Sequence, residues 1–204
     1  MNNIAIIGAG GHTRSSLNLL NNHFEQSKFH IYDTSYNKNS HEVISDIPVC
    51  NKIEMIDTSS KVFVSIGDNK ERAFYFNKFK KQLLTINLFH PTSIIENKTT
   101  FGISNQIFAL AYINSHAIIG DDNIINTQAV IEHEVIIGNH NHISVGSKIC
   151  GRSKIGDFCF FGAGSIVIDK INICDNVIIG AGAVVYKDIK ESGTYIGNPL
   201  RKIK

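Results

Sequence analysis

The stretch INTQAVIEHEVIIGNHNHISVGSKICGRSKI, residues 125–155, has isoleucine at every sixth position. The same frame holds a large apolar residue at each of 17 steps from Phe89 to Val185. Small residues such as Ala129 and Ser147 are common four positions after them. A period of six fits neither the 3.6 of a helix nor the alternation of a flat strand, but it fits short strands separated by corners. The pattern therefore predicts a parallel β-helix, a triangular prism with the large residues on its axis.

One coil of such a prism takes three hexads, and the sequence shows this 18-residue period as well. Ile119-Gly120-Asp121 returns as Ile137-Gly138-Asn139 and again as Ile155-Gly156-Asp157. Glycine, aspartate and asparagine are the residues that tolerate tight corners. Successive coils are expected to stack at about 4.8 Å, with hydrogen bonds between their backbones. Residues 89–190 hold nearly six coils, and the period alone leaves their handedness open.

The first part of the chain has a different composition, because 11 of the 34 isoleucines fall in residues 1–94 and 23 in residues 95–204. Strand-like and helix-like stretches alternate there, which predicts an α/β domain with a small Rossmann-like parallel sheet. The predicted strands are 3–7, 29–33, 61–66 and 85–89, and the predicted helices are 13–24 and 71–83. Ligands of such sheets bind at the carboxyl ends of the strands, where Gly8, Asp33 and Gly67 lie.

Charge and cysteine content exclude several classes of protein. Twenty basic and 18 acidic residues give a net charge of +2, which argues against nucleic acid or a membrane as partner. No apolar run approaches 18 residues, and the N-terminus lacks the basic and apolar regions of a signal peptide. The four cysteines form no CxxC motif, so structural zinc and a disulfide framework are poorly supported. We therefore expect a cytoplasmic protein with reduced thiols.

A glycine-rich stretch, Gly8-Ala9-Gly10-Gly11-His12, follows the first predicted strand. With Thr13 it forms a partial dinucleotide fingerprint that lacks the third glycine. Its backbone N–H groups and the helix that follows suit a phosphate-bearing ligand such as a nucleotide sugar. His12 and Arg14 are candidates for charge-assisted contacts, and Asp33 lies near the distance at which an acid binds a ribose. The alternatives are NAD and a tight turn without a ligand.

Three of the nine histidines, His133, His140 and His142, fall within ten residues. The hexad pattern does not require histidine, so they are not core filler. We interpret His133 as a general base, because the adjacent carboxylate of Glu134 can hold its ring and raise its basicity. The alternatives are a solvated corner and a zinc site formed by the three histidines, although nothing in the spacing forces those side chains together.

Two Gly-Ala-Gly runs, at 162–164 and 180–182, are 18 residues apart and therefore stack on successive coils. Bare backbone along this groove suits a long, thin ligand that carries amides, such as the pantetheine arm of coenzyme A. Glycines kept only for the corners are the alternative. Gly151 lies 18 residues after His133, so we expect its N–H about one strand spacing from the His133 backbone.

Together these motifs resemble the bacterial nucleotide-sugar acetyltransferases of the PglD/NeuD group, which belong to the hexapeptide-repeat acyltransferases. The likeness covers nearly the whole chain, and it rests on Gly8–His12, Ile66–Asn69, His90-Pro91, Val130–Glu134, His142–Gly146 and Gly197–Pro199. The resemblance implies a left-handed prism, an exception to the usual right-handed crossover. It also implies acetyl-CoA as the donor, no metal, and a homotrimer with active sites between neighbouring prisms.

By position, the resemblance implies that His133 is the catalytic base and that Glu134 increases its basicity. The residues implied to contact the coenzyme are His142, Gly151, Ala163 and Ala181. The residues implied to contact the nucleotide sugar are His12, Thr13, Arg14, Asp33, Thr34, Gly67 and Asn126. The implied parts of the chain are a nucleotide-sugar-binding domain at 1–88, an acetyltransferase β-helix at 89–190 and a C-terminal tail at 191–204.

Three hypotheses about function follow. The first is acetyl-CoA-dependent N-acetylation of a UDP-type 4-amino-4,6-dideoxy sugar in bacterial glycan biosynthesis. The second keeps the same residues but makes the product an O-acetylated, sialic-acid-like sugar. The third is a nucleotide-binding scaffold without catalysis, against which the histidines and the Gly-Ala-Gly runs argue.

Overall fold

The computed structural model describes residues 3–35 and 42–204. The chain forms two compact units, Met1–Ile86 and Asn87–Lys204. Within the described ranges, none of the helices has the length and hydrophobicity that crossing a lipid bilayer requires.

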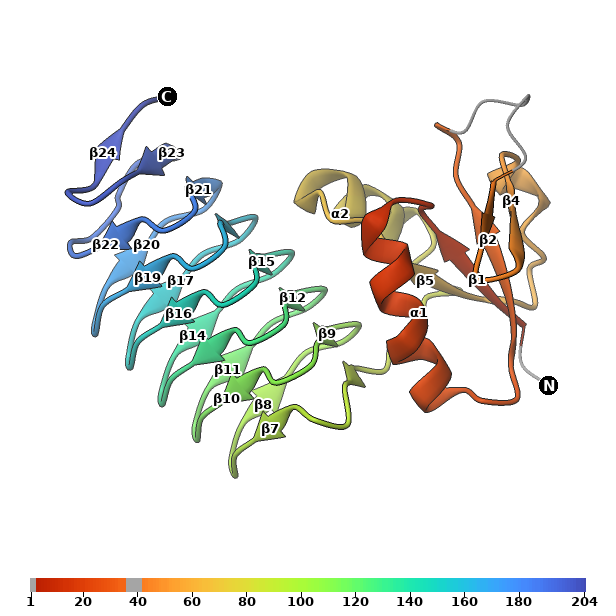
Figure 1. The fold of residues 1–204 in the computed structure, drawn as a ribbon, viewed down its shortest axis with the longest axis horizontal. Helices are drawn as coiled ribbons and strands as arrows, with labels where there is room; N and C mark the ends of the chain where they lie inside the picture. The colour runs from red at the N-terminus through yellow and green to blue at the C-terminus, as the bar shows by residue number, and fades with distance from the viewer. Residues whose placement is uncertain (1–2, 36–41) are drawn as a thin grey trace. The chain divides into compact units, whose positions relative to one another are not determined.

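The first unit is built on a five-stranded sheet in the order β3-β4-β2-β1-β5 (Figure 1). Strands β4, β2, β1 and β5 run parallel, and β3 pairs antiparallel with β4. Its elements are β1 (Asn3–Ile7), α1 (Gly11–His23), β2 (Lys28–Tyr32), β3 (Val43–Ile44), β4 (Ile47–Cys50), the 3-10 helix η1 (Ile53–Met55), β5 (Lys61–Val64) and α2 (Asn69–Lys78). Apolar residues of β1 and α1, among them Ile4, Ile6 and Leu20, are fully buried and form the core.

Two parts of this sheet differ from the sequence prediction. The strand predicted at 85–89 is wrong, because only Leu88–Phe89 is extended, and as β6 it pairs with β9 of the second unit. An isolated bridge between Val62 and Leu83 lies beside β5 instead. The prediction also missed the β3–β4 hairpin, whose turn residues Ser45 and Asp46 have φ of 49° and 65°. Two successive left-handed residues are the mark of a type I′ hairpin turn.

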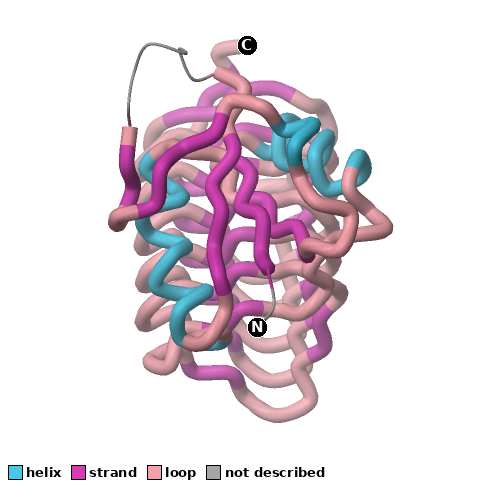
Figure 2. The backbone as a smooth tube through the Cα atoms, turned by 90° about the vertical axis from the view of Figure 1, so that its right-hand side faces the viewer, coloured by secondary structure: helices cyan, strands magenta, loops and turns pink. Residues whose placement is uncertain are grey.

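The second unit is a prism with three parallel sheets, whose coils follow one another from β7 to β22 in Figure 1. Figure 2 shows the short strands of these coils interrupted by turns. The first face holds β7 (Ile94–Ile95), β10 (Tyr112–Ile113), β13 (Val130–Ile131), β16 (Lys148–Ile149), β19 (Ile166–Val167) and β22 (Val184–Val185). The second face holds β8 (Thr100–Phe101), β11 (Ile118–Ile119), β14 (Ile136–Ile137), β17 (Lys154–Ile155) and β20 (Asn172–Ile173).

The third face holds β6 (Leu88–Phe89), β9 (Gln106–Ile107), β12 (Ile124–Ile125), β15 (His142–Ile143), β18 (Phe160–Phe161) and β21 (Val177–Ile179). The segment predicted as a tail extends this face, because β23 (Gly193–Ile196) pairs with β21 and then with β24 (Arg201–Lys202). Successive strands of a face are 18 residues apart, as in the pairing of Tyr112 with Val130. The predicted fold is confirmed as a small parallel-sheet domain followed by a left-handed parallel β-helix.

The isoleucines of the six-residue frame fill the axis of the prism. Ile125 and Ile131 are completely buried, and Ile137 is 1% exposed. Burying such a side chain contributes about 1.5–3 kcal/mol relative to leaving it in water. One such residue per hexad therefore stabilises every face of every coil.

The turns after β8, β11, β14 and β17 form one edge of the prism, which we call the glycine–aspartate corner. The carboxylate of Asp157 accepts the N–H of Asn139, one coil earlier, at 2.7 Å, and this pattern repeats along the corner. A Cβ atom on Gly138 would lie 2.2 Å from Asp157 Oδ1, which excludes any larger residue. The Gly-Asp/Asn repeat is thus a hydrogen-bonded ladder that holds the coils together.

Candidate active site and nucleotide pocket

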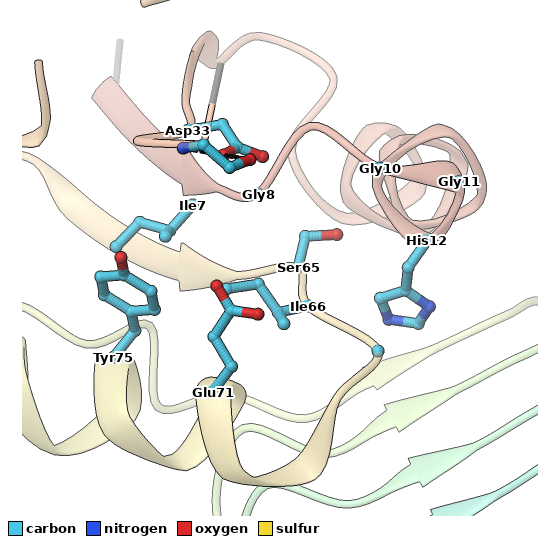
Figure 3. A pocket seen from close by; sticks show the side chains of 12 residues that line it. Ile7, Gly8, Gly10, Gly11, His12, Asp33, Ser65, Ile66, Glu71 and Tyr75 are labelled. Carbon is cyan, nitrogen blue, oxygen red and sulfur yellow. Dashed lines mark hydrogen bonds between the residues drawn. The ribbon is translucent and has the colours of Figure 1, made fainter. Parts of the chain in front are cut away.

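The first unit contains a pocket of about 370 Å³ at the carboxyl ends of β1, β2 and β5 (Figure 3). Such a volume is large enough for part of a nucleotide. It is lined by Ile7, Gly8, Gly10, Gly11, His12, Asp33, Ser35, Ser65, Ile66, Gly67, Glu71 and Tyr75. The predicted residues His12, Asp33 and Gly67 therefore come together in one place.

The glycines around the pocket, in the loop between β1 and α1 and at Gly67 after β5, serve two different purposes. Gly8 has a φ of +108°, and a Cβ atom there would lie 2.6 Å from the Ser65 carbonyl oxygen, so the fold itself requires glycine. A Cβ on Gly10, Gly11 or Gly67 would meet nothing within 4 Å. The last three glycines therefore leave space in front of the backbone, which is where a ligand can approach it.

The N-terminus of α1 is suited to an anion, whereas that of α2 is already capped. Gly10, the residue before α1, makes no side-chain cap, and the first turn of the helix has no acidic residue. In α2, Asp68 accepts the N–H groups of Lys70 at 3.0 Å and Glu71 at 2.9 Å. A helix N-terminus without a side-chain cap attracts negative charge through its N–H groups and the helix dipole, so the start of α1 is suited to the phosphate-bearing ligand that the glycine-rich motif predicts.

Asp33 lines the pocket and also fixes the loop above it. Its Oδ2 accepts the N–H of Ala9 at 2.7 Å, and its Oδ1 accepts the N–H and the hydroxyl of Ser35 at 2.9 and 2.6 Å. Next to it, the Thr34 hydroxyl lies 3.4 Å from the hydroxyl of Tyr75, a pocket residue that the sequence did not indicate.

Three residues of the first unit that were predicted to contact the substrate, Thr13, Arg14 and Thr34, do not line the pocket. Thr13 is completely buried, and its hydroxyl donates to the carbonyl oxygen of Gly8 at 2.8 Å. Arg14 donates to the carboxylate of Glu42 and to the carbonyl oxygen of Ala9. Both side chains therefore donate hydrogen bonds to backbone carbonyl oxygens of the glycine-rich loop. They position that loop instead of lining the pocket.

A buried arginine on α2, missed by sequence reasoning, supports the opposite wall. Arg72 is completely buried, and its guanidinium donates to the carbonyl oxygens of Ile66 and Gly67 at 3.3 Å and to Asn69 Oδ1 at 3.0 Å. The preceding residue, Glu71, projects into the pocket (Figure 3). Burial raises the pKa of the Glu71 carboxyl, and the negative charges of Asp68 and Asp33 raise it further.

In the second unit, the turns after β10, β13, β16 and β19 form an edge that we call the histidine corner. His133 Nδ1 lies 3.0 Å from Glu134 Oε2, so the predicted pair is in contact. The two side chains are 43% and 57% exposed, which leaves the pair accessible to a substrate. The ring of His133 lies over Gly151, since a Cβ atom there would be 2.7 Å from both Cε1 and Nε2.

The backbone of Gly151 carries a free N–H beside this ring. Arg152, rather than Gly151, donates its N–H to the His133 carbonyl oxygen, at 3.0 Å. One and two coils earlier, the equivalent N–H groups are accepted by the preceding side chains, Glu132 and Asn114. Cys150 stands in that position before Gly151. Among the described residues, nothing accepts the Gly151 N–H, although Gly151 is buried.

The turns after β12, β15, β18 and β21 form the third edge, the Gly-Ala-Gly corner. Asn126 caps the N–H of Thr127 at 2.8 Å, and its Nδ2 lies 3.2 Å from His142 Nε2. Two and three coils after Thr127 stand Ala163 and Ala181, both exposed, and their N–H groups have no partner among the described residues. Asn126 and His142 therefore share an edge with the Gly-Ala-Gly runs, and not with His133.

The three clustered histidines do not gather around a common point. His140 lies at the glycine–aspartate corner, where its Nδ1 is 2.8 Å from the buried Asp122 carboxylate. His133 lies at the histidine corner, and His142 lies in β15 on the third face. Across residues 3–35 and 42–204, no group of three His, Cys, Asp or Glu side chains is arranged to hold a metal ion.

Comparisons with known proteins agree with this arrangement. The PglD N-terminal domain model matches residues 3–79, and the hexapeptide repeat of succinyl-transferase matches residues 153–187. The crystal structure of perosamine N-acetyltransferase from Caulobacter crescentus, in complex with CoA and GDP-perosamine, is 28% identical, with a TM-score of 0.90 over 100% of this chain and 98% of that one. The chain is therefore similar to PglD-type proteins in its N-terminal part and to hexapeptide-repeat acyltransferases in its second part.

Two further structures share the fold of this chain along its whole length. The acetyltransferase domain of PglB from Neisseria gonorrhoeae is 23% identical, with a TM-score of 0.87, and WeeI from Acinetobacter baumannii is 21% identical, with a TM-score of 0.91. Both comparisons cover 100% of each chain. No curated protein sequence matches the chain.

Proposed function

We propose that this protein transfers an acetyl group from acetyl-CoA to the amine of a nucleotide-linked 4-amino-4,6-dideoxy sugar, as a step in bacterial glycan biosynthesis. The observation that carries the proposal is the histidine corner, where an accessible imidazole held by a carboxylate lies beside a free backbone N–H. The comparison with perosamine N-acetyltransferase supports an amine as the acceptor.

The corner supplies what acyl transfer from a thioester requires. His133 Nε2 takes a proton from the sugar amine as the amine nitrogen attacks the thioester carbonyl, and Glu134 stabilises the imidazolium that forms. The negative charge that develops on the carbonyl oxygen is met by the Gly151 N–H. The carbon–sulfur bond then breaks, coenzyme A leaves as its thiol after taking up a proton, and the acetamide remains on the sugar.

The Gly-Ala-Gly corner is the proposed path of the coenzyme arm. The exposed N–H groups of Ala163 and Ala181 can donate to the two amide carbonyls of pantetheine, because no side chain covers them. His142 and Asn126 would then lie toward the thioester end, on earlier coils of the same edge.

A homotrimer completes the site in this proposal. The histidine corner and the Gly-Ala-Gly corner border the two sides of the first face, so one chain separates the base from the coenzyme groove. The outward side chains of that face are mostly apolar, namely Ile94, Tyr112, Val130, Ile166 and Val184, with Lys148 among them. A second copy related by three-fold rotation would cover this face and bring its own groove to His133.

Complementation between inactive chains tests the shared site. His133→Ala chains lack the base, and in Ala163→Trp chains the indole fills the groove. After dissociation and reassembly of an equal mixture, each mixed trimer has one interface with both unmutated halves, so we expect about a quarter of wild-type activity. Native mass spectrometry confirms the mixed trimers. If these trimers form and the activity stays at the level of the two parents, each site lies within one chain.

In the first unit, the proposed ligand lies with its diphosphate at the N-terminus of α1 and its nucleoside toward Asp33 and Tyr75. The UDP form stays a prediction from the sequence. Guanine is the competing base, because the carboxylate of Glu71 can accept two N–H groups from guanine, whereas uracil offers a single N–H between two carbonyl oxygens. Among the described residues, no group donates a hydrogen bond to the Glu71 carboxylate, so it is available to a base.

A substrate screen tests the activity and identifies the base. UDP-, GDP-, dTDP- and CMP-linked 4-amino sugars are incubated with acetyl-CoA, and thiol release is recorded. We expect turnover with the UDP or the GDP sugar, and a product that survives mild alkali because it is an amide. Loss of the acetyl group in alkali would indicate an ester and the O-acetylating alternative. Binding of a nucleotide sugar without thiol release from any acceptor would favour the scaffold.

A further inference from the structure

One hydroxyl in the wall of this pocket is buried without a hydrogen-bond partner among the described residues. Ser65, in the wall of the pocket at the end of β5, is 2% exposed, and its hydroxyl oxygen has no hydrogen-bond partner among the described residues. The backbone of Ser65, in contrast, is hydrogen-bonded on both sides. Its N–H donates to the carbonyl oxygen of Ile7, and its carbonyl oxygen accepts from the hydroxyl of Thr13. A buried hydroxyl without a partner is costly, and native proteins seldom keep one unless water or a ligand satisfies it.

The direction of this hydroxyl indicates which part of a ligand it meets. In Figure 3 the Ser65 side chain points toward Gly10, Gly11 and His12, and away from Glu71 and Tyr75. On that side lies the uncapped N-terminus of α1. The N–H groups at the start of the helix and the Ser65 hydroxyl are all donors around the same space, so a group with several acceptor oxygens and negative charge fits between them.

We infer that Ser65 is a binding residue for the diphosphate of the nucleotide sugar, to which its hydroxyl donates a hydrogen bond. This inference rests on the proposed function, and it names a contact that neither the glycine-rich motif nor the resemblance indicated. Because the oxygen is almost completely shielded, the acceptor must lie directly against the wall. A phosphate oxygen reaches such a position more easily than a ring does.

The test separates binding from stability. Ser65→Ala and Ser65→Cys remove the hydroxyl at nearly constant volume, and calorimetry measures the affinity for UDP and GDP and for the nucleosides uridine and guanosine. We expect at least a tenfold weaker affinity for the diphosphate that the wild type binds, because a hydrogen bond to a charged group is lost. The affinity for the nucleoside and the KM for acetyl-CoA should stay unchanged. The melting temperature should not fall, since no internal hydrogen bond is broken.

Ser60→Ala is the matched control, because Ser60 is also buried in the first unit but does not line the pocket. An unchanged diphosphate affinity in the Ser65 variants would overturn the inference while leaving the proposed function intact. So would a drop of several degrees in melting temperature, which would show that the hydroxyl supports the fold. If the wild type binds neither diphosphate, the proposed function and this inference fall together.

Discussion

His133→Ala is expected to lower kcat by about 10²–10⁴-fold, the range that general-base catalysis supplies. The imidazole is 43% exposed and contacts Glu134, so its loss removes no packing from the core. The melting temperature and the assembly state should therefore stay those of the wild type. Steady-state thiol release at saturating acetyl-CoA and amino sugar measures the effect.

Two further variants make this result specific. His116→Ala removes an exposed histidine from the same corner, one coil before Glu134, and should leave kcat unchanged. Glu134→Gln keeps the contact to the ring but not the charge, so its kcat should fall by less than that of His133→Ala. Near-wild-type turnover of His133→Ala on the true acceptor would remove His133 from the mechanism.

The prism could be predicted from the sequence because each hexad repeats the same physical requirement. A large side chain must fill the axis at Ile125, Ile131 and Ile137, and only glycine fits where Gly138 meets the next coil. Such local rules do not depend on contacts with distant parts of the chain. The contact between His133 and Glu134 could be predicted for the same reason, since the two residues are neighbours.

The first unit was harder to predict because its contacts are long-range. Arg72 has the position of a solvent-facing charge on a helix, and only the folded chain shows it buried against the carbonyl oxygens of Ile66 and Gly67. Thr13 follows the glycine-rich loop directly, yet its hydroxyl turns inward to Gly8. The β3–β4 hairpin was missed because Ser45 and Asp46 are weaker turn signals than Asn-Gly.

The free N–H of Gly151 could have been found from the sequence, because it depends on one column of residues 18 positions apart. Asn114 and Glu132 can accept the N–H of the residue that follows, and in the structure they do, at 2.7 and 3.4 Å. Cys150 is the next residue in that column, and its thiol is a poor acceptor. Burial and the nearby carboxylates of Glu132 and Asp169 raise the pKa of this thiol, which keeps it neutral.

The second large effect on kcat is expected for Cys150→Asn, a substitution within this column of residues. The new amide oxygen should accept the Gly151 N–H, as Asn114 does for Ser115 two coils earlier, and so withdraw it from the reaction. The kcat should fall by about 10²–10³-fold, the usual effect of losing one donor to the oxyanion. The fold should be unaffected, because the column already holds asparagine at position 114.

Cys150→Ala is the control, because alanine removes the thiol but offers no acceptor to the Gly151 N–H. Its kcat should stay within a few-fold of the wild type, and the KM values of both variants should change little, since the N–H acts on the charge that develops in the transition state. A crystal structure of the Cys150→Asn variant would show whether the amide has bound the N–H. If that bond forms and kcat stays near the wild-type value, the oxyanion is stabilised elsewhere, and the role proposed for Gly151 is wrong.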